Sequence, residues 1–197
     1  MNALSPVPGS FQIDATVGGG AHSLGILGAA SPGGRLLGLD ADAAAIERSR
    51  ARLARFGDQV VLRRGNFEAI GTVAREAGFG QVDGILMDLG LSSHQLADEA
   101  RGFSFRTHGL LDMRFDTTVG VPASELVATL DADGLADLFR RHGEEPHAWR
   151  IAKVIVTERS RDPIVTADRL AAVIARAVPA QPAARRRIHP ATRVFQA

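Results

Sequence analysis

A glycine-rich turn that begins with an acidic residue is the first segment of the chain that could bind a ligand. It runs from Asp14 to Ser23 and reads DATVGGGAHS. Three glycines let the backbone turn tightly and approach a bound group, and a helix that follows would offer free N–H groups. Gly18 and Gly20 fit a dinucleotide fingerprint, but its third glycine is replaced by Ser23. A carboxylate repels a pyrophosphate, so Asp14 favours a ligand with an amino group. Alternatively, the segment could be a tight turn between a strand and a helix that binds no ligand.

Three positions further along the chain have side chains that suit a nucleoside. Asp40 follows Asp14 by 26 residues, where a carboxylate could accept hydrogen bonds from ribose hydroxyls. Phe67 could stack on an adenine, and Asp88 opens a polar loop. Two of these positions have a structural alternative, because Asp40 could cap a helix and Phe67 could be a core residue. The glycine turn and these three residues, in this order along the chain, favour S-adenosylmethionine, which has no phosphate, over a nicotinamide dinucleotide.

The candidate ligand residues lie at the ends of four short segments with β-strand character. These segments cover residues 11–14, 35–40, 59–63 and 82–88. They recur about every 24 residues, which is typical of a strand followed by a helix. Residues 41–56 show the periodicity of an amphipathic helix. We therefore predict an α/β fold with a parallel sheet, in which the carboxyl ends of the strands meet at one edge and bind the ligand.

The pattern changes after Ser92. Residues 94–116 are polar and irregular, and four helices are predicted after them, over residues 123–130, 132–141, 148–159 and 166–178. Asp131 and Thr166 stand where N-caps are expected. Four helices in succession indicate a separate helical module rather than a continuation of the sheet.

Composition excludes several other classes of protein. The chain has 197 residues, of which 45% are hydrophobic, and this is enough for one sizeable core. It has no cysteine, which excludes disulfides, thiolate zinc sites and a cysteine nucleophile. The six histidines form no HExxH-like pair, so no metal site is expected. There is no apolar run of membrane-spanning length and no signal peptide pattern, so we expect a cytoplasmic protein without a membrane partner.

Basic residues are concentrated late in the chain. Residues 101–197 hold 14 Arg and one Lys against 11 acidic residues, including the run Arg185, Arg186, Arg187. Such a surface would suit a phosphate-rich partner such as a nucleic acid. A solvated face in a protein that uses Arg in place of Lys is the alternative.

Five separated motifs resemble one known family. In chain order they are DATVGGGAHS from Asp14, DLGLSSHQL from Asp88, RGFSF from Arg101, LDMRFD from Leu111 and HPATRVFQA from His189. Together they resemble the ribosomal RNA small subunit methyltransferase H family, also called MraW, from about Ile13 to the last residue. The resemblance implies a Rossmann-like sheet that depends on S-adenosylmethionine, with an inserted helical domain. It also implies methylation of the exocyclic 4-amino group of a cytidine in the decoding region of 16S rRNA, in the small ribosomal subunit.

The resemblance also assigns roles to individual residues. The residues that it implies for cofactor binding are Gly20, Ala21, His22, Asp40, Phe67, Asp88 and Gln95. Asp88 is in addition the expected catalytic acceptor, because it ends the strand beside the methyl donor. Two positions depart from the usual motif: Ala21 replaces a glycine, and His94 replaces a proline.

A second set of residues is expected to bind RNA. Phe103 and Phe105 alternate with Arg101 and, further on, Arg114, so they could stack on a flipped base and hold adjoining phosphates. Alternatively, these phenylalanines could anchor the helical module to the sheet domain. The set of expected contacts to the RNA backbone is Arg185, Arg186, Arg187 and Arg193.

The expected domains are a Rossmann-like cofactor-binding domain over 1–100, a helical substrate-recognition insertion over 101–188, and the start of a return to the first domain over 189–197. The family normally has a helical lead-in and later strands, so the chain looks truncated at both ends. We expect it to be poorly soluble or inactive alone. Three rivals stay open: a nicotinamide-linked dehydrogenase, a non-catalytic RNA-binding module, and an amino-methyltransferase acting on DNA or protein. The sequence makes no prediction of oligomeric state.

Overall fold

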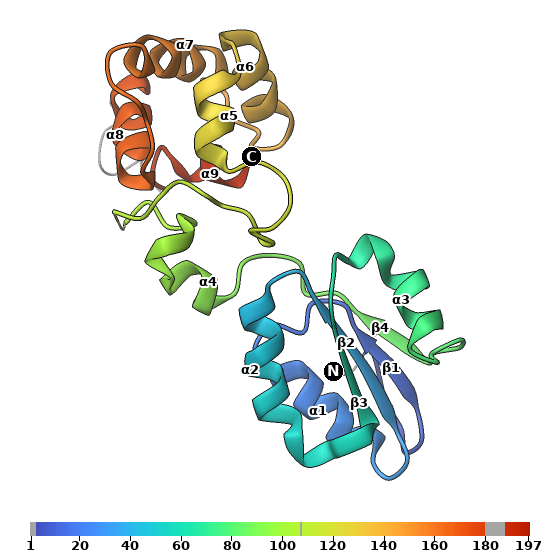
Figure 1. Ribbon diagram of the computed structural model, residues 1–197. Coiled ribbons are helices and arrows are strands. Elements are labelled where there is room, and N and C mark those ends of the chain that lie inside the picture. The colour runs from blue at the N-terminus through green and yellow to red at the C-terminus, as the bar shows by residue number, and fades with distance from the viewer. Residues whose placement is uncertain (1–2, 107, 180–187) are drawn as a thin grey trace. The chain divides into compact units, whose positions relative to one another are not determined.

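A computed structural model describes residues 3–106, 108–179 and 188–197, and the chain forms two compact units, residues 1–90 and 91–197 (Figure 1). The division falls at Gly90, whereas the sequence places the change of domain at residue 100. In the parts of the chain that the structure describes, no helix has both the length and the apolar character needed to cross a membrane.

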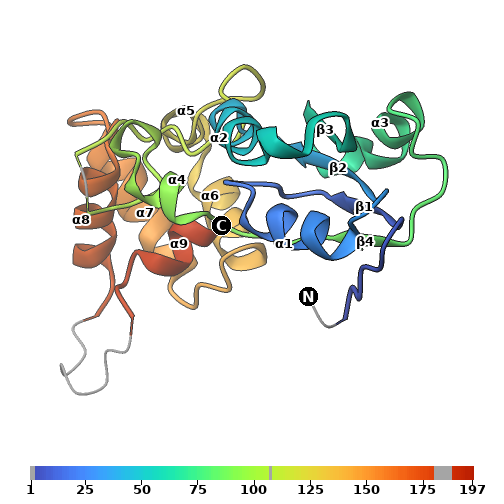
Figure 2. The same ribbon diagram turned by 90° about the horizontal axis from the view of Figure 1, so that it is seen from below.

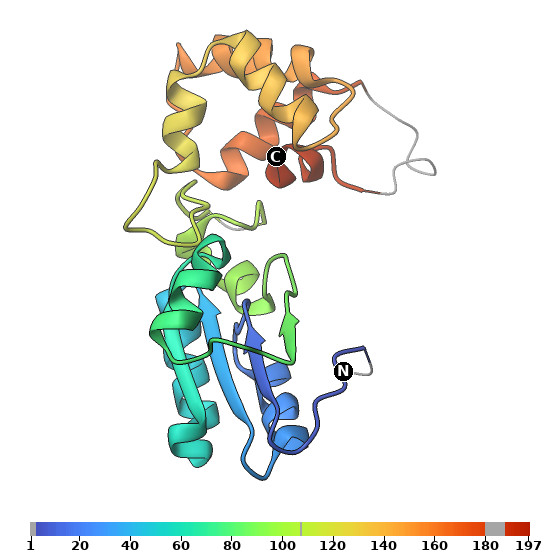
Figure 3. The same ribbon diagram turned by 90° about the vertical axis from the view of Figure 1, so that its right-hand side faces the viewer.

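The first unit contains a four-stranded parallel sheet. Its strands are β1 (Phe11–Asp14), β2 (Arg35–Asp40), β3 (Val60–Arg64) and β4 (Gly84–Leu86). The strand order is β3-β2-β1-β4, and every pairing is parallel, so the predicted sheet is confirmed. The chain moves outward from β1 to β3 and then returns to place β4 on the free side of β1; Figure 3 shows β4, in green, beside β1, in dark blue.

Helices cover both faces of this sheet because its strands alternate their apolar side chains between them. Leu36 packs with α1 (Ala21–Ala30) and α2 (Ala43–Leu53), whereas Leu37 and Leu39 pack on the other face with α3 (Ile70–Glu76). The helix predicted over residues 41–56 is therefore present, but it ends at Leu53 and a 3-10 segment, Ala54–Gln59, follows it. This is the Rossmann-like α/β arrangement that the sequence predicts.

The second unit is helical, as predicted (Figure 2). Four of its helices are α5 (Ala123–Thr129), α6 (Ala132–Arg141), α7 (Ala148–Arg159) and α8 (Ala167–Ala177), and each lies within one residue of its predicted bounds. Two shorter helices of this unit are α4 (Ser93–Ala97) and α9 (Thr192–Gln196), and a 3-10 segment covers Glu99–Arg101. The first unit has a 3-10 segment at Phe67–Ala69. Asp131 caps α6 by accepting a hydrogen bond from Gly134 N at 2.8 Å.

A single apolar core holds the helical unit together. Leu135 and Phe139 of α6, Ile151 and Ile155 of α7 and Ile174 of α8 are all buried in it. Ala191 and Val194 are buried in the same core, so residues 191–194 pack with the helices. A return to the first domain after residue 188 stays a prediction.

Candidate functional site

The carboxyl ends of all four strands lie at one edge of the sheet in the first unit. The connection after β1 leads to β2 on one side of it, whereas the connection after β3 leads to β4 on its other side. Such a switch point is where open parallel sheets bind ligands. The residues that follow the strands are the glycine turn after β1, Asp40 at the end of β2, Phe67 after β3 and Asp88 after β4. Four of the sequence-predicted ligand positions therefore lie at the same edge.

The glycine turn is held from within the first unit. Gly18 N donates a hydrogen bond to Asp40 Oδ2 at 2.9 Å, and Ser49 Oγ of α2 donates one to Gly18 O at 2.8 Å. Gly18 and Gly20 have positive φ angles of 53° and 76°, which glycine adopts without steric cost. Ala21 needs no such angle because it is the first residue of α1. The departure from the family motif at Ala21 therefore leaves the turn intact.

Asp40 connects the loops that follow three strands. Its other carboxylate oxygen, Oδ1, accepts a hydrogen bond from Asp42 N at 2.9 Å, and its backbone oxygen accepts one from Gly65 N at 2.9 Å. The helix cap is Asp42, which accepts from Ala44 N, so capping α2 is not the role of Asp40. A carboxylate has about four acceptor positions, so the two oxygens of Asp40 retain capacity for ligand hydroxyls.

Asp14 supports the turn from a buried position. Its carboxylate accepts hydrogen bonds from Ser23 Oγ at 2.6 Å and from Thr16 N at 3.2 Å, and the side chain is almost completely buried. Burial raises the pKa of this carboxyl above its ordinary value, although both hydrogen bonds oppose the rise. Both oxygens therefore serve the fold, and Asp14 lies behind the turn rather than on its surface.

Asp88 and His22 form an exposed pair beside the turn. The backbone N of Asp88 donates to Thr16 Oγ1 at 2.8 Å, which ties the loop after β4 to the loop after β1. His22 Nε2, on the first turn of α1, lies 3.4 Å from Asp88 Oδ2, and the two side chains are 58% and 69% exposed. The carboxylate of Asp88 is thus anchored through its backbone and remains accessible to a ligand.

Phe67 is exposed at the same edge of the sheet. It begins the 3-10 segment after β3, which Asn66 caps by accepting from Glu68 N at 3.0 Å. The ring is 42% exposed, so Phe67 is not a core residue. An accessible ring in this place could stack on a base.

The predicted positions Gln95, Arg101 and Arg114 lie in the second unit, where each has partners within that unit. Gln95 is buried and forms a capping box with Ser92 at the start of α4. Arg101 donates to the backbone oxygens of Arg114 and Phe115. Arg114 binds both carboxylate oxygens of Asp112, and these hydrogen bonds lower the pKa of Asp112.

The predicted RNA-binding phenylalanines are also engaged inside this unit. Phe103 is 6% exposed, and Phe105 stacks on His189 and packs edge-on against Phe195. Arg193 donates to Glu144 O at 3.0 Å. These contacts all lie within the second unit. Both the anchoring of the helical module to the sheet domain and an RNA-binding role for the phenylalanines stay predictions. The run from Arg185 to Arg187 lies outside the described residues.

The positioning roles of three residues were not predicted from the sequence. They are Thr16, which anchors Asp88, and the two serines Ser23 and Ser49. Ser49 lies on the buried side of α2 together with Ala45, Ile46 and Leu53. A polar residue on an otherwise apolar helix stripe was the available signal, because a buried hydroxyl needs a hydrogen-bond partner.

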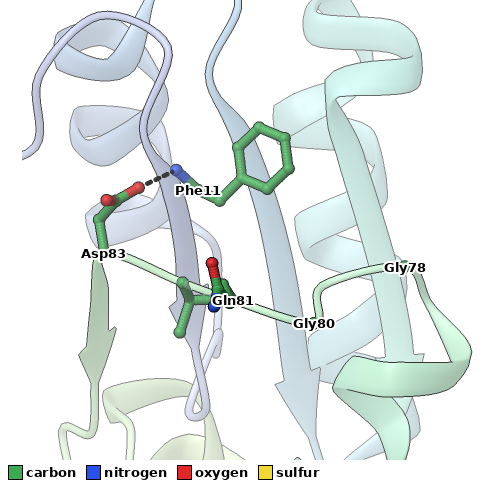
Figure 4. A pocket seen from close by; sticks show the side chains of 6 residues that line it. Phe11, Gly78, Gly80, Gln81 and Asp83 are labelled. Carbon is green, nitrogen blue, oxygen red and sulfur yellow. Dashed lines mark hydrogen bonds between the residues drawn. The ribbon is translucent and has the colours of Figure 1, made fainter.

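A hollow of about 760 Å³ lies at the opposite, amino-terminal end of the strands (Figure 4). It is lined by Phe11, Gly78, Gly80, Gln81, Val82 and Asp83. The carboxylate of Asp83 accepts a hydrogen bond from Phe11 N at 2.7 Å and so closes the start of the β1–β4 pair. None of the predicted ligand residues lines this hollow, and within the described residues no three His, Asp or Glu side chains are grouped to hold a metal ion.

The conformation of Gly20 predicts a cost for any side chain there. A Cβ at this position would lie 3.2 Å from Ser49 Oγ and 3.4 Å from Ser49 Cα, with φ at 76°. Gly20→Ala is therefore expected to lower the free energy of unfolding by about 1–2 kcal/mol, measured by urea denaturation. Gly28→Ala is the control, because Gly28 lies inside α1 with open space around it. That change should raise stability by about 0.5–1 kcal/mol, and equal effects of the two changes would contradict the prediction.

The raised pKa of Asp14 predicts how stability depends on pH. Between the ordinary pKa of an aspartate and the higher value in the folded protein, the folded state binds more protons than the unfolded state. The free energy of unfolding should therefore fall as pH rises through this window and stay low above it. Asp14→Asn removes this dependence, so the stability of the wild type relative to Asp14→Asn should decrease upward from about pH 4. A difference that stays constant with pH would contradict this.

Comparisons with known proteins agree with the resemblance seen in the sequence. The sequence model of the MraW methylase family matches residues 1–197. A protein from Thermomicrobium roseum is 54% identical over 98% of this chain and 59% of its own length. Relatives from Syntrophotalea carbinolica and Symbiobacterium thermophilum are each 47% identical over the full chain and 62% of their own lengths. All three are named ribosomal RNA small subunit methyltransferase H, and the chain spans about three fifths of their length.

Proposed function

Because the chain belongs to the MraW methylase family, we propose that it supplies the S-adenosylmethionine site of a methyltransferase acting on ribosomal RNA of the small subunit. The observation that carries this proposal is the network around Asp40, which joins the glycine turn to the ends of β2 and β3. This network holds together a carboxylate, the glycine turn and the loop that precedes an exposed aromatic ring.

The residues at this edge fit the chemistry of S-adenosylmethionine. The carboxylates of Asp40 and Asp88 suit ribose hydroxyls and a ligand with positive charge, and Phe67 suits an adenine. The first turn of α1 has no side-chain cap, so its backbone N–H groups can receive the ligand's carboxylate. The part of the site that receives this carboxylate would be lined by Gly20, Ala21 and His22. Gln95 belongs to the second unit, and its part in binding is proposed from the family motif alone.

The reaction requires an acceptor close to the amine that is methylated. S-Adenosylmethionine would supply an electrophilic methyl group to the site. A cytosine amine is a weak nucleophile because its lone pair is delocalised into the ring. We propose that the exposed carboxylate of Asp88 accepts a hydrogen bond from this amine, holds it out of the ring plane and stabilises the positive charge that develops on nitrogen. It would then accept the proton that the methylated nitrogen releases. His22, 3.4 Å from Asp88, would help to orient the carboxylate.

The substrate follows from the family rather than from the geometry. The named relatives act, by their names, on small-subunit ribosomal RNA, and we extend this to the present chain. The 4-amino group of a cytidine in the decoding region of 16S rRNA is the target that the sequence motifs imply. A protein with this substrate would work in the cytoplasm. The target base would have to leave its stack to reach the site, which is least costly in a single-stranded or distorted region.

Isothermal titration of S-adenosylmethionine into the chain tests the cofactor. We expect saturable binding of S-adenosylmethionine and no comparable binding of NAD⁺, because the glycine turn lacks the third glycine of a dinucleotide fingerprint. Preferential binding of NAD⁺ would favour a dehydrogenase. A chain that binds RNA but neither nucleotide would favour a non-catalytic RNA-binding module.

A further inference from the structure

Helix α7 of the second unit has one face in the core and one face in solvent. Its buried face consists of Ala148, Ile151, Ala152 and Ile155. The opposite face carries the exposed residues Trp149, Arg150, Lys153 and Thr157, which we call the α7 stripe. Since successive residues of an α-helix are about 100° apart, these four positions fall within an arc of about 100°. The stripe contains two cations and no carboxylate.

Neither cation of the α7 stripe pairs with a carboxylate among the described residues. The side chain of Arg150 has no hydrogen-bond partner there, and Lys153 Nζ lies over the Trp149 ring, 4.8 Å from its centroid. The acid on this helix, Glu158, is half-buried and pairs with Arg176 at 2.7 Å, away from the stripe.

Other arginines of the same unit behave differently. Arg141 pairs with Asp137 at 2.8 Å, Arg169 pairs with Asp162 at 2.7 Å, and Arg159 binds the backbone oxygens of Val127 and Leu130 at the end of α5. Each of these three arginines thus already has a partner within the fold. The charge on the α7 stripe is therefore available to an anion outside the protein.

The exposed tryptophan identifies the kind of anion. Trp149 leaves 43% of its surface in solvent, which is unusual for the largest aromatic side chain. An accessible indole beside two cations is the combination that binds single-stranded nucleic acids, because the ring stacks on a base and the cations contact phosphates.

We propose that the α7 stripe is a contact surface for single-stranded RNA, with Trp149 stacking on a base and Arg150 and Lys153 binding the adjoining phosphates. The proposal rests on the proposed function only in the choice of RNA as the polymer. It assigns RNA contact to residues other than the phenylalanines and arginines that the sequence motifs suggest.

The single tryptophan of the chain provides a direct probe. Titration of the full chain with a 15-nucleotide single-stranded RNA is expected to quench the fluorescence of Trp149 in a saturable manner. By anisotropy of the labelled RNA, Trp149→Ala should weaken binding about tenfold, whereas Trp149→Phe, which keeps a stacking ring, should retain most of the affinity. Circular dichroism should show unchanged helicity, because the stripe lies outside the core.

A charge variant and a matched control test the phosphate contacts. Arg150→Glu with Lys153→Glu should weaken RNA binding more than tenfold. Loss of two phosphate contacts should also reduce the steepness of log affinity against log salt by about 1.4, at about 0.7 for each contact with a single strand. Arg52→Glu with Arg75→Glu changes the net charge equally, but on α2 and α3 of the first unit, and should alter affinity less than twofold.

Three results would overturn the proposal. The first is unquenched Trp149 emission at saturating RNA. The second is an equal loss of affinity in the two charge variants, because the effect would then be one of net charge alone. The third is equal binding and quenching by polyglutamate or by phosphatidylglycerol vesicles, which would show a general anion surface. RNA binding through the stripe without binding of S-adenosylmethionine would support this proposal and refute the proposed cofactor site, so the two failures are distinguishable.

Discussion

Replacing Asp40 with alanine is expected to abolish binding of S-adenosylmethionine, with a loss of affinity of at least a hundredfold. Two hydrogen bonds, from Gly18 N and Asp42 N, would lose their acceptor, and the ribose would lose its expected partner. Hydrogen bonds to a charged group contribute about 1.5–3 kcal/mol each. Loss of the ribose contacts together with loosening of the turn should therefore lower the affinity by more than a hundredfold. Isothermal titration measures the effect.

A matched control separates binding from general stability. Asp131→Ala also removes a carboxylate that accepts a backbone hydrogen bond, but at the start of α6 in the other unit. It should cost about 1 kcal/mol of unfolding free energy and leave cofactor affinity unchanged. Asp40→Asn keeps one acceptor oxygen and should lie between wild type and Asp40→Ala. An Asp40→Ala protein with near-normal affinity would remove the ribose contact from the proposed site.

In the proposed methyltransferase, loss of the Asp88 carboxylate is expected to stop methyl transfer. Asp88→Ala removes the acceptor for the amine, and removal of an acid–base group typically lowers a rate by about 10²–10⁴-fold. The exposed side chain has no part in the core, and the backbone bond to Thr16 persists, so the variant should fold. The measurement is transfer of a radiolabelled methyl group to small ribosomal subunits, with cofactor affinity determined in parallel.

Two further variants locate the effect of Asp88. Asp83→Asn, at the other end of β4, keeps an oxygen that can accept from Phe11 N and should leave transfer unchanged. Thr16→Val removes the acceptor for Asp88 N and should lower transfer by less than Asp88→Ala, because the carboxylate is displaced and not lost. Asp88→Ala with a wild-type rate would exclude the carboxylate from the reaction.

The sheet and the placement of its ligand residues could be predicted because both depend on local patterns. A short continuous apolar run, residues 36–39, defines β2, and an acid that ends a parallel strand must lie at the carboxyl edge of the sheet, as Asp40 does. β4 is shorter than the predicted 82–88 strand. Within the described residues it pairs with β1 alone, and at its start the side chain of Asp83, rather than a backbone oxygen, binds Phe11 N.

The roles of the arginines in the second unit could not be predicted in the same way. Arg114 reaches Asp112 because Met113, between them, has a positive φ of 62°. Residues other than glycine rarely adopt this conformation, and no local sequence pattern predicts it at Met113. The sequence therefore showed an arginine near phenylalanines, but not that the fold would neutralise its charge.

The hydrogen bonds that hold the glycine turn have a consequence for affinity. Gly18 is fixed on both sides by Asp40 and Ser49, and Thr16 is joined to the loop of Asp88, all from within the protein. A preorganised turn has little conformational entropy left to lose when a small molecule arrives. Differences in affinity among nucleoside analogues should then arise mainly from how quickly each one dissociates.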